Sequence, residues 1–212
     1  MRVSKILTSL VIIFILVFIL LLPGIYSRRE IKNISSKGKN IICFGDSITF
    51  GYGVNPGEDY PAALAKLVGM SVINAGIDGD TSVDGLKRIK ADVLDKEPYL
   101  VLIEFCGNDF IKKIPLDVTV ANVKKMIAQA QAQGAMVAIV DVSAGLFLIE
   151  YRLSFLKLAW ESGAIFVPGV LTKIITNPSM KSDFMHPNVA GYTLVAQRVY
   201  NFISPYLKGQ GE

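Results

Sequence analysis

The sequence predicts an α/β protein, a three-layer α/β/α sandwich around a five-stranded, parallel, doubly wound sheet. Three observations predict it. From residue 40 onward, short apolar runs alternate with longer amphipathic runs. The short runs are apolar throughout, as is typical of strands covered on both faces. The chain has 212 residues, of which 51% are hydrophobic, which suffices for one domain with a full core and leaves little for a second.

Each run predicts an element from its length and residue pattern. The short runs predict strands at residues 41–44, 71–74, 99–105, 136–140 and 164–167. The longer runs predict helices at residues 60–68, 81–96, 118–133, 148–162 and 189–203. In the helix at 81–96, one face carries Leu86, Ile89, Val93 and Leu94. We expect Asn188 to cap the last helix, because an asparagine side chain can accept a hydrogen bond from the first turn.

Ahead of the domain lies an apolar segment, residues 6–22, interrupted only by Thr8 and Ser9. Its length is at the short end of the roughly 17–25 residues that cross a bilayer and exceeds the about 7–15 of a signal-peptide core. Residues 24–27 offer no good pair of small residues for a signal-peptide cut. We therefore expect residues 1–26 to form a retained membrane anchor that holds the domain outside the cytoplasm. A cleaved signal segment, which would give a secreted protein, is the alternative.

The formal net charge of +4 is concentrated near the N-terminus. Seven basic residues and one acidic residue precede residue 40, whereas the remainder has 15 basic and 17 acidic residues. Residues 27–39 are polar and basic and predict a linker, followed by one domain at 40–212. Because the domain itself is not basic, its composition argues against nucleic acid as a partner.

The two cysteines, Cys43 and Cys106, lie in apolar, strand-like runs and predict buried free thiols. The chain has one histidine, His186, and the cysteines are far apart in sequence. This set has no spacing typical of a zinc site. The sequence therefore predicts neither a metal site nor a cofactor.

Polar and small residues follow each of the first three predicted strands. Ser47 comes just after the first, Gly76 after the second and Asn108 after the third. In an open parallel sheet, sites form beyond the carboxyl ends of the strands, at the point where strand order reverses. A serine there can be a nucleophile, a glycine lets the backbone approach a ligand, and an asparagine amide can donate a hydrogen bond. Taken singly, each also fits an ordinary turn.

Near the C-terminus, Asp183 precedes His186 by three residues. At this spacing a carboxylate can reach Nδ1 of the imidazole on one side of a turn and leave Nε2 facing a hydroxyl group. A lone histidine is more often structural than catalytic. This one, however, follows an aspartate and stands at the entry to a helix.

Together, these four motifs in this order resemble the SGNH (GDSL-type) hydrolase family. The name-giving positions match as Ser47, Gly76, Asn108 and His186, and the resemblance covers about residues 40–205. The flanking sequences also match: Gly-Asp-Ser-Ile-Thr at 45–49, Gly-Asn-Asp at 107–109 and Asp-x-x-His-Pro-Asn at 183–188. The resemblance implies a flavodoxin-like sheet with strand order 2-1-3-4-5, which would bring the ends of the first three strands together.

The resemblance also implies roles for the matching residues. Ser47 would be acylated, His186 would act as its base, and Asp183 would orient the imidazole. The backbone N–H groups of Ser47 and Gly76 and the side-chain amide of Asn108 would form the oxyanion hole. We expect Asp46 and Asp109, which flank these positions, to stabilise the turns.

The leading functional hypothesis is a membrane-tethered serine ester hydrolase that cleaves carboxylic esters or thioesters, as a lysophospholipase or arylesterase does. One alternative is a carbohydrate O-acetylesterase or an O-acyltransferase acting on surface glycans, since one fold and site can support these chemistries. The other alternative is a non-catalytic binding module on the same fold. The expected partners are a small ester or acyl-lipid substrate and, through the N-terminal segment, a membrane.

Overall fold

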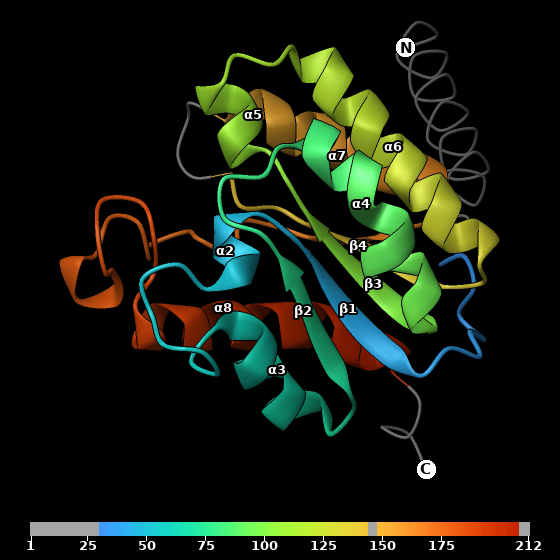
Figure 1. Ribbon diagram of the computed structural model, residues 1–212, viewed down its shortest axis with the longest axis horizontal. Coiled ribbons are helices and arrows are strands. Elements are labelled where there is room, and N and C mark those ends of the chain that lie inside the picture. Colours follow the sequence, from blue (N-terminus) through green and yellow to red (C-terminus); the bar gives the residue numbers. More distant parts are fainter. Residues whose placement is uncertain (1–29, 144–147, 208–212) are drawn as a thin grey trace, which may run out of the picture. The chain divides into compact units, whose positions relative to one another are not determined.

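The computed structural model describes residues 30–143 and 148–207, and within them five parallel strands form one sheet in the order β2-β1-β3-β4-β5 (Figure 1). The strands are β1 (Asn40–Gly45), β2 (Val72–Gly76), β3 (Pro98–Glu104), β4 (Met136–Val140) and β5 (Ile165–Val167). The predicted fold class and the implied strand order are confirmed. Strand order reverses at β1, which lies between β2 and β3.

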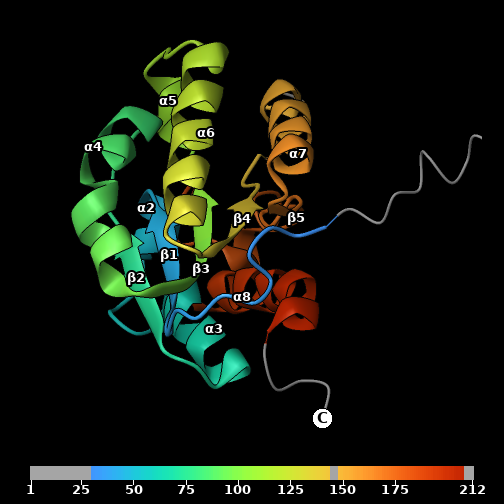
Figure 2. The ribbon, with the colours of Figure 1, turned by 90° about the vertical axis from the view of Figure 1, so that its right-hand side faces the viewer.

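Helices cover both faces of the sheet (Figures 1 and 2). One layer contains α4 (Ser82–Asp92), α6 (Leu116–Ala132) and α7 (Ile149–Ser162), and the other contains α3 (Tyr60–Val68) and α8 (Val189–Ile203). The bounds of α3, α8 and β4 coincide with those expected from the apolar pattern. Asn188 caps α8, as predicted, because its side chain accepts a hydrogen bond from the N–H of Gly191.

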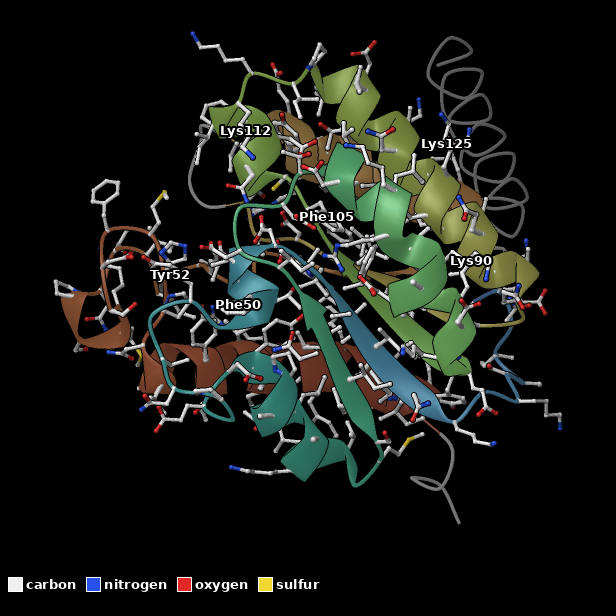
Figure 3. The ribbon with its side chains drawn as sticks, viewed as in Figure 1. Phe50, Tyr52, Lys90, Phe105, Lys112 and Lys125 are labelled. Carbon is white, nitrogen blue, oxygen red and sulfur yellow. The ribbon has the colours of Figure 1, made fainter. Side chains whose placement is uncertain are left out.

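Buried strands and close backbone packing form the core. All seven residues of β3 are buried. Phe105, which follows β3, lies against α4 (Figure 3), where a Cβ on Gly85 would come within 2.5 Å of its ring. The helix therefore needs a glycine at this position to approach the sheet. Cys43 and Cys106 are free and buried, as expected.

The predicted helix at 81–96 is wrong at its C-terminal end. Thr81 and Asp84 form a capping box at the start of α4, but the helix ends at Asp92 and a 3₁₀ turn follows at Leu94–Lys96. Val93 leaves the helical conformation with φ −127° while its side chain stays fully buried. The apolar spacing therefore continued past the helix because the turn also faces the core.

Two short helices were not expected. Helix α2 (Ser47–Phe50) directly follows the first strand of the sheet, and α5 (Gly107–Ile111) begins three residues after the end of β3. Four or five residues are too few to show a helical period in a sequence. Both helices begin at the edge of the sheet where the expected site residues lie.

Part of the predicted linker, from Ile31 onward, lies against the domain. Ile31 is buried, the N–H of Lys32 donates to the carbonyl of Gly163, and the Asn33 amide donates to the carbonyls of Gln131 and Ala135. The compact unit accordingly begins at Ile31. The predicted anchor or signal at 1–26 lies outside the described residues, as do linker residues 27–29. Among the helices that the structure does describe, none is long and apolar enough to cross a membrane.

Candidate active site

The turn after β1 presents Ser47 as the first residue of α2. Asp46 caps this helix, with its Oδ1 atom accepting a hydrogen bond from the N–H of Ile48 at 3.0 Å. Arg88 of α4 donates to the carbonyl oxygens of Gly45 and Ala75, at 3.0 and 2.8 Å. These bonds tie the ends of β1 and β2 to the helix layer, so the backbone that carries Ser47 is held from two sides.

His186 lies in the loop between β5 and α8, which a short antiparallel bridge from Lys181 to Pro187 closes. Within the loop, Oδ1 of Asp183 accepts hydrogen bonds from the N–H groups of Met185 and His186, both at 2.8 Å. This arrangement is an Asx turn, the local geometry that aspartate favours. It folds the loop so that the Asp183 carboxylate and the imidazole face each other.

The three expected catalytic side chains meet beyond the carboxyl ends of the strands. Oδ2 of Asp183 lies 2.8 Å from Nδ1 of His186, and Nε2 of His186 lies 3.1 Å from Oγ of Ser47. Tyr52 packs on the imidazole with a ring-centroid separation of 4.5 Å, and Figure 3 shows Tyr52 beside the loop that carries it. A hydroxyl, an imidazole and a carboxylate are therefore joined in a single chain of hydrogen bonds.

The Asp183 carboxyl is held in its ionised form. Partial desolvation alone would raise its pKa, but hydrogen bonds from the backbone N–H and imidazole of His186 and from the N–H of Met185 outweigh it and lower the pKa to about 2. An ionised carboxylate at Nδ1 requires the proton on that nitrogen, which leaves Nε2 as an acceptor toward Ser47.

The N–H of Gly76, which the sequence predicted to be an oxyanion donor, has a hydrogen-bond partner in the structure. That N–H donates to the side chain of Asn74 at 2.9 Å. Gly76 lines a separate hollow with Phe50 and Asn74 and is not among the described residues that line the Ser47–His186 cavity. A Cβ on Gly76 would lie 2.2 Å from the backbone nitrogen of Phe50. A glycine is therefore needed here because α2 approaches the end of β2 so closely.

Asn108 lies beside the nucleophile turn, as expected. Its Nδ2 atom donates to the carbonyl oxygen of Asp80 at 2.9 Å and to Oδ2 of Asp46 at 3.3 Å. Asp109, in contrast, is fully buried away from the cavity, where it accepts hydrogen bonds from Ser82 and Thr119. Asp46 thus stabilises the turn that carries Ser47, as predicted, whereas Asp109 joins α5 to α4 and α6.

Besides Asp46, a second buried carboxyl group lies next to the turn that carries Ser47, and the sequence did not predict it. Glu104, the last residue of β3, is fully buried, and its Oε2 atom accepts hydrogen bonds from Thr49 Oγ1 at 2.8 Å and from the N–H of Asp46 at 3.2 Å. Burial, together with repulsion from Asp46, raises the pKa of Glu104 well above its ordinary value. In the sequence, this group is marked only by one glutamate at the end of an apolar run, a pattern that predicts a buried strand and not a polar site.

A cavity of about 190 Å³ opens beside Ser47 and His186. Its described lining is mostly aliphatic, and Asn108 and the catalytic side chains lie at its polar end. The apolar lining comes from several elements and loops: Ile48, Ile111, Val142, Leu148, Leu171, Ile175, Phe184 and Met185. These residues lie far apart in the sequence, so no local pattern indicates them as one set.

The doubly wound sheet and the residues at its carboxyl edge define the chain as an SGNH hydrolase. It belongs to the GDSL-like lipase/acylhydrolase family, whose family model matches residues 43–194. It is similar to the arylesterase of Vibrio mimicus, with 28% identity over 78% of this chain and 88% of the relative. It is also similar to the thioesterase 1/protease 1/lysophospholipase L1 of Escherichia coli K12, with 25% identity over 78% and 83% of the two chains.

Among solved structures, the crystal structure of TesA superposes with a TM-score of 0.73 at 26% identity, covering 80% of this chain and all of that one. The family and these relatives establish the present chain as an enzyme that hydrolyses ester bonds.

Proposed function

We propose that the protein hydrolyses esters through an acyl-serine intermediate on Ser47. The observation that carries this proposal is the chain of contacts from Asp183 to His186 to Ser47, with separations of 2.8 and 3.1 Å. A serine hydroxyl is a weak nucleophile until a base removes its proton during attack. Nε2 of His186 lies within the distance at which a general base can act.

The reaction proceeds in two halves. Ser47 Oγ attacks the ester carbonyl carbon while its proton passes to Nε2 of His186; the tetrahedral intermediate then collapses, and the imidazolium returns the proton to the leaving alcohol or thiol. A water molecule next attacks the acyl-serine while its proton passes to His186; the second tetrahedral intermediate collapses, the imidazolium returns this proton to Ser47 Oγ, and the acid is released. Throughout, the Asp183 carboxylate stabilises the imidazolium and fixes its tautomer.

The tetrahedral oxyanion needs donors that are already in place. We assign two of them to the N–H of Ser47 and the amide of Asn108, which exchanges its longer hydrogen bond to Asp46 for the oxyanion. We assign the third to the N–H of Gly79 in place of Gly76. Gly79 has φ +79° and adjoins Asp80, whose carbonyl binds the Asn108 amide. Within the described residues, no hydrogen bond occupies the Gly79 N–H.

The preferred substrate, we propose, carries an aliphatic acyl group longer than acetyl, as in a lysophospholipid, an acyl thioester or a short- to medium-chain ester. The cavity next to Ser47 is lined by aliphatic side chains, which an acetyl group would leave largely unfilled. Each methylene buried there contributes about 0.8 kcal/mol, or roughly a fourfold gain in kcat/KM. This lining favours an acyl-ester hydrolase over an O-acetylesterase of surface glycans.

We further propose that residues 1–26 retain the enzyme at a membrane, with the catalytic domain outside the cytoplasm. The support is the uninterrupted apolar character of residues 10–22 and the lack of a signal-peptide cleavage pattern after it. Membrane fractions should keep the full chain after alkaline carbonate washing, and its N-terminus should be intact by mass spectrometry. Release at alkaline pH, or a cleaved N-terminus, would refute the anchor.

The test of the hydrolase proposal is turnover of p-nitrophenyl acetate, butyrate and decanoate by the full chain in detergent. Ser47→Ala is compared with Ser35→Ala, which alters an exposed serine away from the cavity. We expect release that increases beyond acetate, is lost in Ser47→Ala and is unchanged in Ser35→Ala. Activity that survives in Ser47→Ala would refute the mechanism, and a steep preference for acetate would favour the O-acetylesterase alternative.

A further inference from the structure

Beside the nucleophile turn, two carboxyl groups lie together and are almost completely buried. Asp46 is 3% exposed and Glu104 0%. They come from adjacent strands, because β1 pairs with β3 and places Gly45 opposite Glu104. Gly45 leaves the space they need, since a Cβ there would lie 2.5 Å from Oε2 of Glu104. The turn is therefore built around the pair.

The two oxygens of Glu104 have different environments. Oε2 accepts hydrogen bonds from Thr49 Oγ1 and from the N–H of Asp46. Oε1 is buried, and no donor among the described residues reaches it. A buried carboxylate oxygen without a donor is costly. The same oxygen carrying a proton becomes a donor, and the nearby Asp46 carboxylate is an acceptor for it.

The surroundings favour a single shared negative charge. Burial, with repulsion from Asp46, raises the pKa of Glu104 well above its usual range. Burial raises the pKa of Asp46 only to about 6, because the N–H of Ile48 and a hydrogen bond with Glu104 stabilise its ionised form. Other titratable groups also face the pair: Tyr60 from α3, Tyr192 from α8, Cys106 after β3, Asp109 from α5 and His186. None of these except His186 can bring a positive charge.

We propose that Glu104 is protonated at neutral pH and donates a hydrogen bond from Oε1 to the Asp46 carboxylate, and that it thereby acts as a positioning residue for Ser47 and Asn108. This inference rests on the proposed function for its kinetic consequences. Asp46 is the connecting group, since its Oδ1 accepts from the N–H of Ile48 and its Oδ2 from the Asn108 amide. A fixed Asp46 carboxylate keeps both the nucleophile turn and the amide in place.

The proposal predicts an alkaline fall in kcat that depends on Glu104. When Glu104 loses its proton, two negative charges lie side by side in a buried site, and Asp46 loses the donor that fixes it. The turn then shifts, and with it Ser47 and Asn108. Glu104 is not among the described residues that line the aliphatic cavity, so its titration should change KM little.

Two variants of Glu104 distinguish a role as hydrogen-bond donor to Asp46 from a role as a side chain that only fills the core. In Glu104→Gln the amide NH₂ replaces the O–H donor and the amide oxygen accepts from Thr49, so we expect most of kcat to remain and the alkaline fall to move to higher pH or vanish. Glu104→Leu fills a similar volume without a donor, and we expect kcat to fall about 10- to 100-fold, the effect of a lost hydrogen bond to a charged group, at nearly constant KM. Thermal unfolding confirms that each variant is folded.

Infrared difference spectroscopy tests the proton itself. At neutral pH the wild-type protein should show the C=O stretching band of a protonated carboxyl group, which Glu104→Gln removes and the exposed Glu161→Gln leaves in place. Absence of the band, or a kcat loss in Glu104→Gln as large as in Glu104→Leu, would overturn the proposal. The infrared result does not require turnover. If the wild-type enzyme cleaves no ester, the proposed function fails while the state of Glu104 is still decided.

Discussion

The turn that carries Ser47 (the nucleophile turn) and the loop that carries His186 (the histidine loop) are both held by hydrogen bonds, but these bonds come from different parts of the chain. The turn that carries Ser47 is buried and is held by Glu104 of β3 and Arg88 of α4, which reach it from other elements. The loop that carries His186 lies at the surface, and next to His186 the side chain of Phe184 is 86% exposed. The loop is held mainly by its own residues, because Asp183 accepts two backbone N–H groups within three positions.

This difference implies different vulnerabilities. Damage to the nucleophile turn should reach the core and lower stability as well as rate. Damage to the histidine loop should lower the rate while leaving the core intact. The nearby carboxyl groups differ in the same way, since burial raises the pKa of Asp46 and Glu104, whereas hydrogen bonds lower the pKa of Asp183.

The largest effect should come from Asp183→Asn in the histidine loop. The amide cannot stabilise the imidazolium and favours the wrong tautomer, so we expect kcat to fall by about 10³- to 10⁴-fold. The midpoint of thermal unfolding should change little, because the loop lies outside the core. Ester-hydrolysis assays measure kcat, and calorimetry on the same preparation measures the unfolding midpoint. A cooperative loss of stability would show that the loop supports the core after all.

The next largest effect should come from Asn108→Ala beside the nucleophile turn. Loss of one oxyanion donor costs about 10²- to 10³-fold in kcat. Here the change also removes the hydrogen bonds to Asp80 and Asp46, so we expect a measurable loss of stability as well. Asn122→Ala is the matched control, because this asparagine donates to Ser82 in the neighbouring buried cluster and not at the cavity. Equal rate losses in both variants would refute the oxyanion assignment.

Gly76→Ala should affect stability more than chemistry. The added methyl group would meet the backbone of Phe50 and Thr49, and overpacking of this kind costs about 1–3 kcal/mol. The midpoint of thermal unfolding of the variant should therefore be clearly lower than that of the wild-type protein. At temperatures well below this midpoint, kcat should fall much less than in Asn108→Ala. A rate loss as large as that of Asn108→Ala, with unchanged stability, would restore Gly76 to the oxyanion hole.

The smallest effects should be opposite pH dependences of stability for the two regions. The pKa of Glu104 is raised in the folded state, so its contribution is complete below its unfolded pKa of about 4.3 and is lost as pH rises from there. The lowered pKa of Asp183 makes its contribution complete above about pH 4 and lost as pH falls toward about 2. Urea unfolding from pH 3 to 9 should show a weaker alkaline decline in Glu104→Gln and a weaker acid decline in Asp183→Asn. An unchanged profile in either variant would contradict the corresponding shift.

Most of the fold was predictable because its signals are local. The apolar runs defined all five strands, and the helices at 60–68 and 189–203 matched to the residue. Helix 81–96 was overextended because Val93, the residue after α4, is also buried and continues the apolar pattern. The catalytic residues were predictable in part, since Ser47 follows a strand and the Asp183–His186 spacing is that of a turn.

The remaining features depend on contacts that sequence spacing does not encode. The packing of α2 on Gly76 is visible only in three dimensions, and so is the pairing of Glu104 with Asp46. The cavity lining could not be predicted for the same reason. Leu171 and Ile175 lie in an irregular segment after β5, where no apolar period indicates a common face.

The most direct test of the central claim is labelling with a fluorophosphonate, which phosphonylates an activated serine. A mechanism that uses Ser47 as the nucleophile predicts one label per chain, located on Ser47 by peptide mass spectrometry, with loss of ester hydrolysis in proportion to labelling. His186→Ala should slow the labelling strongly, whereas Ser35→Ala should leave it unchanged. Labelling of another serine, or full esterase activity in a protein whose Ser47 is completely modified, would contradict the account.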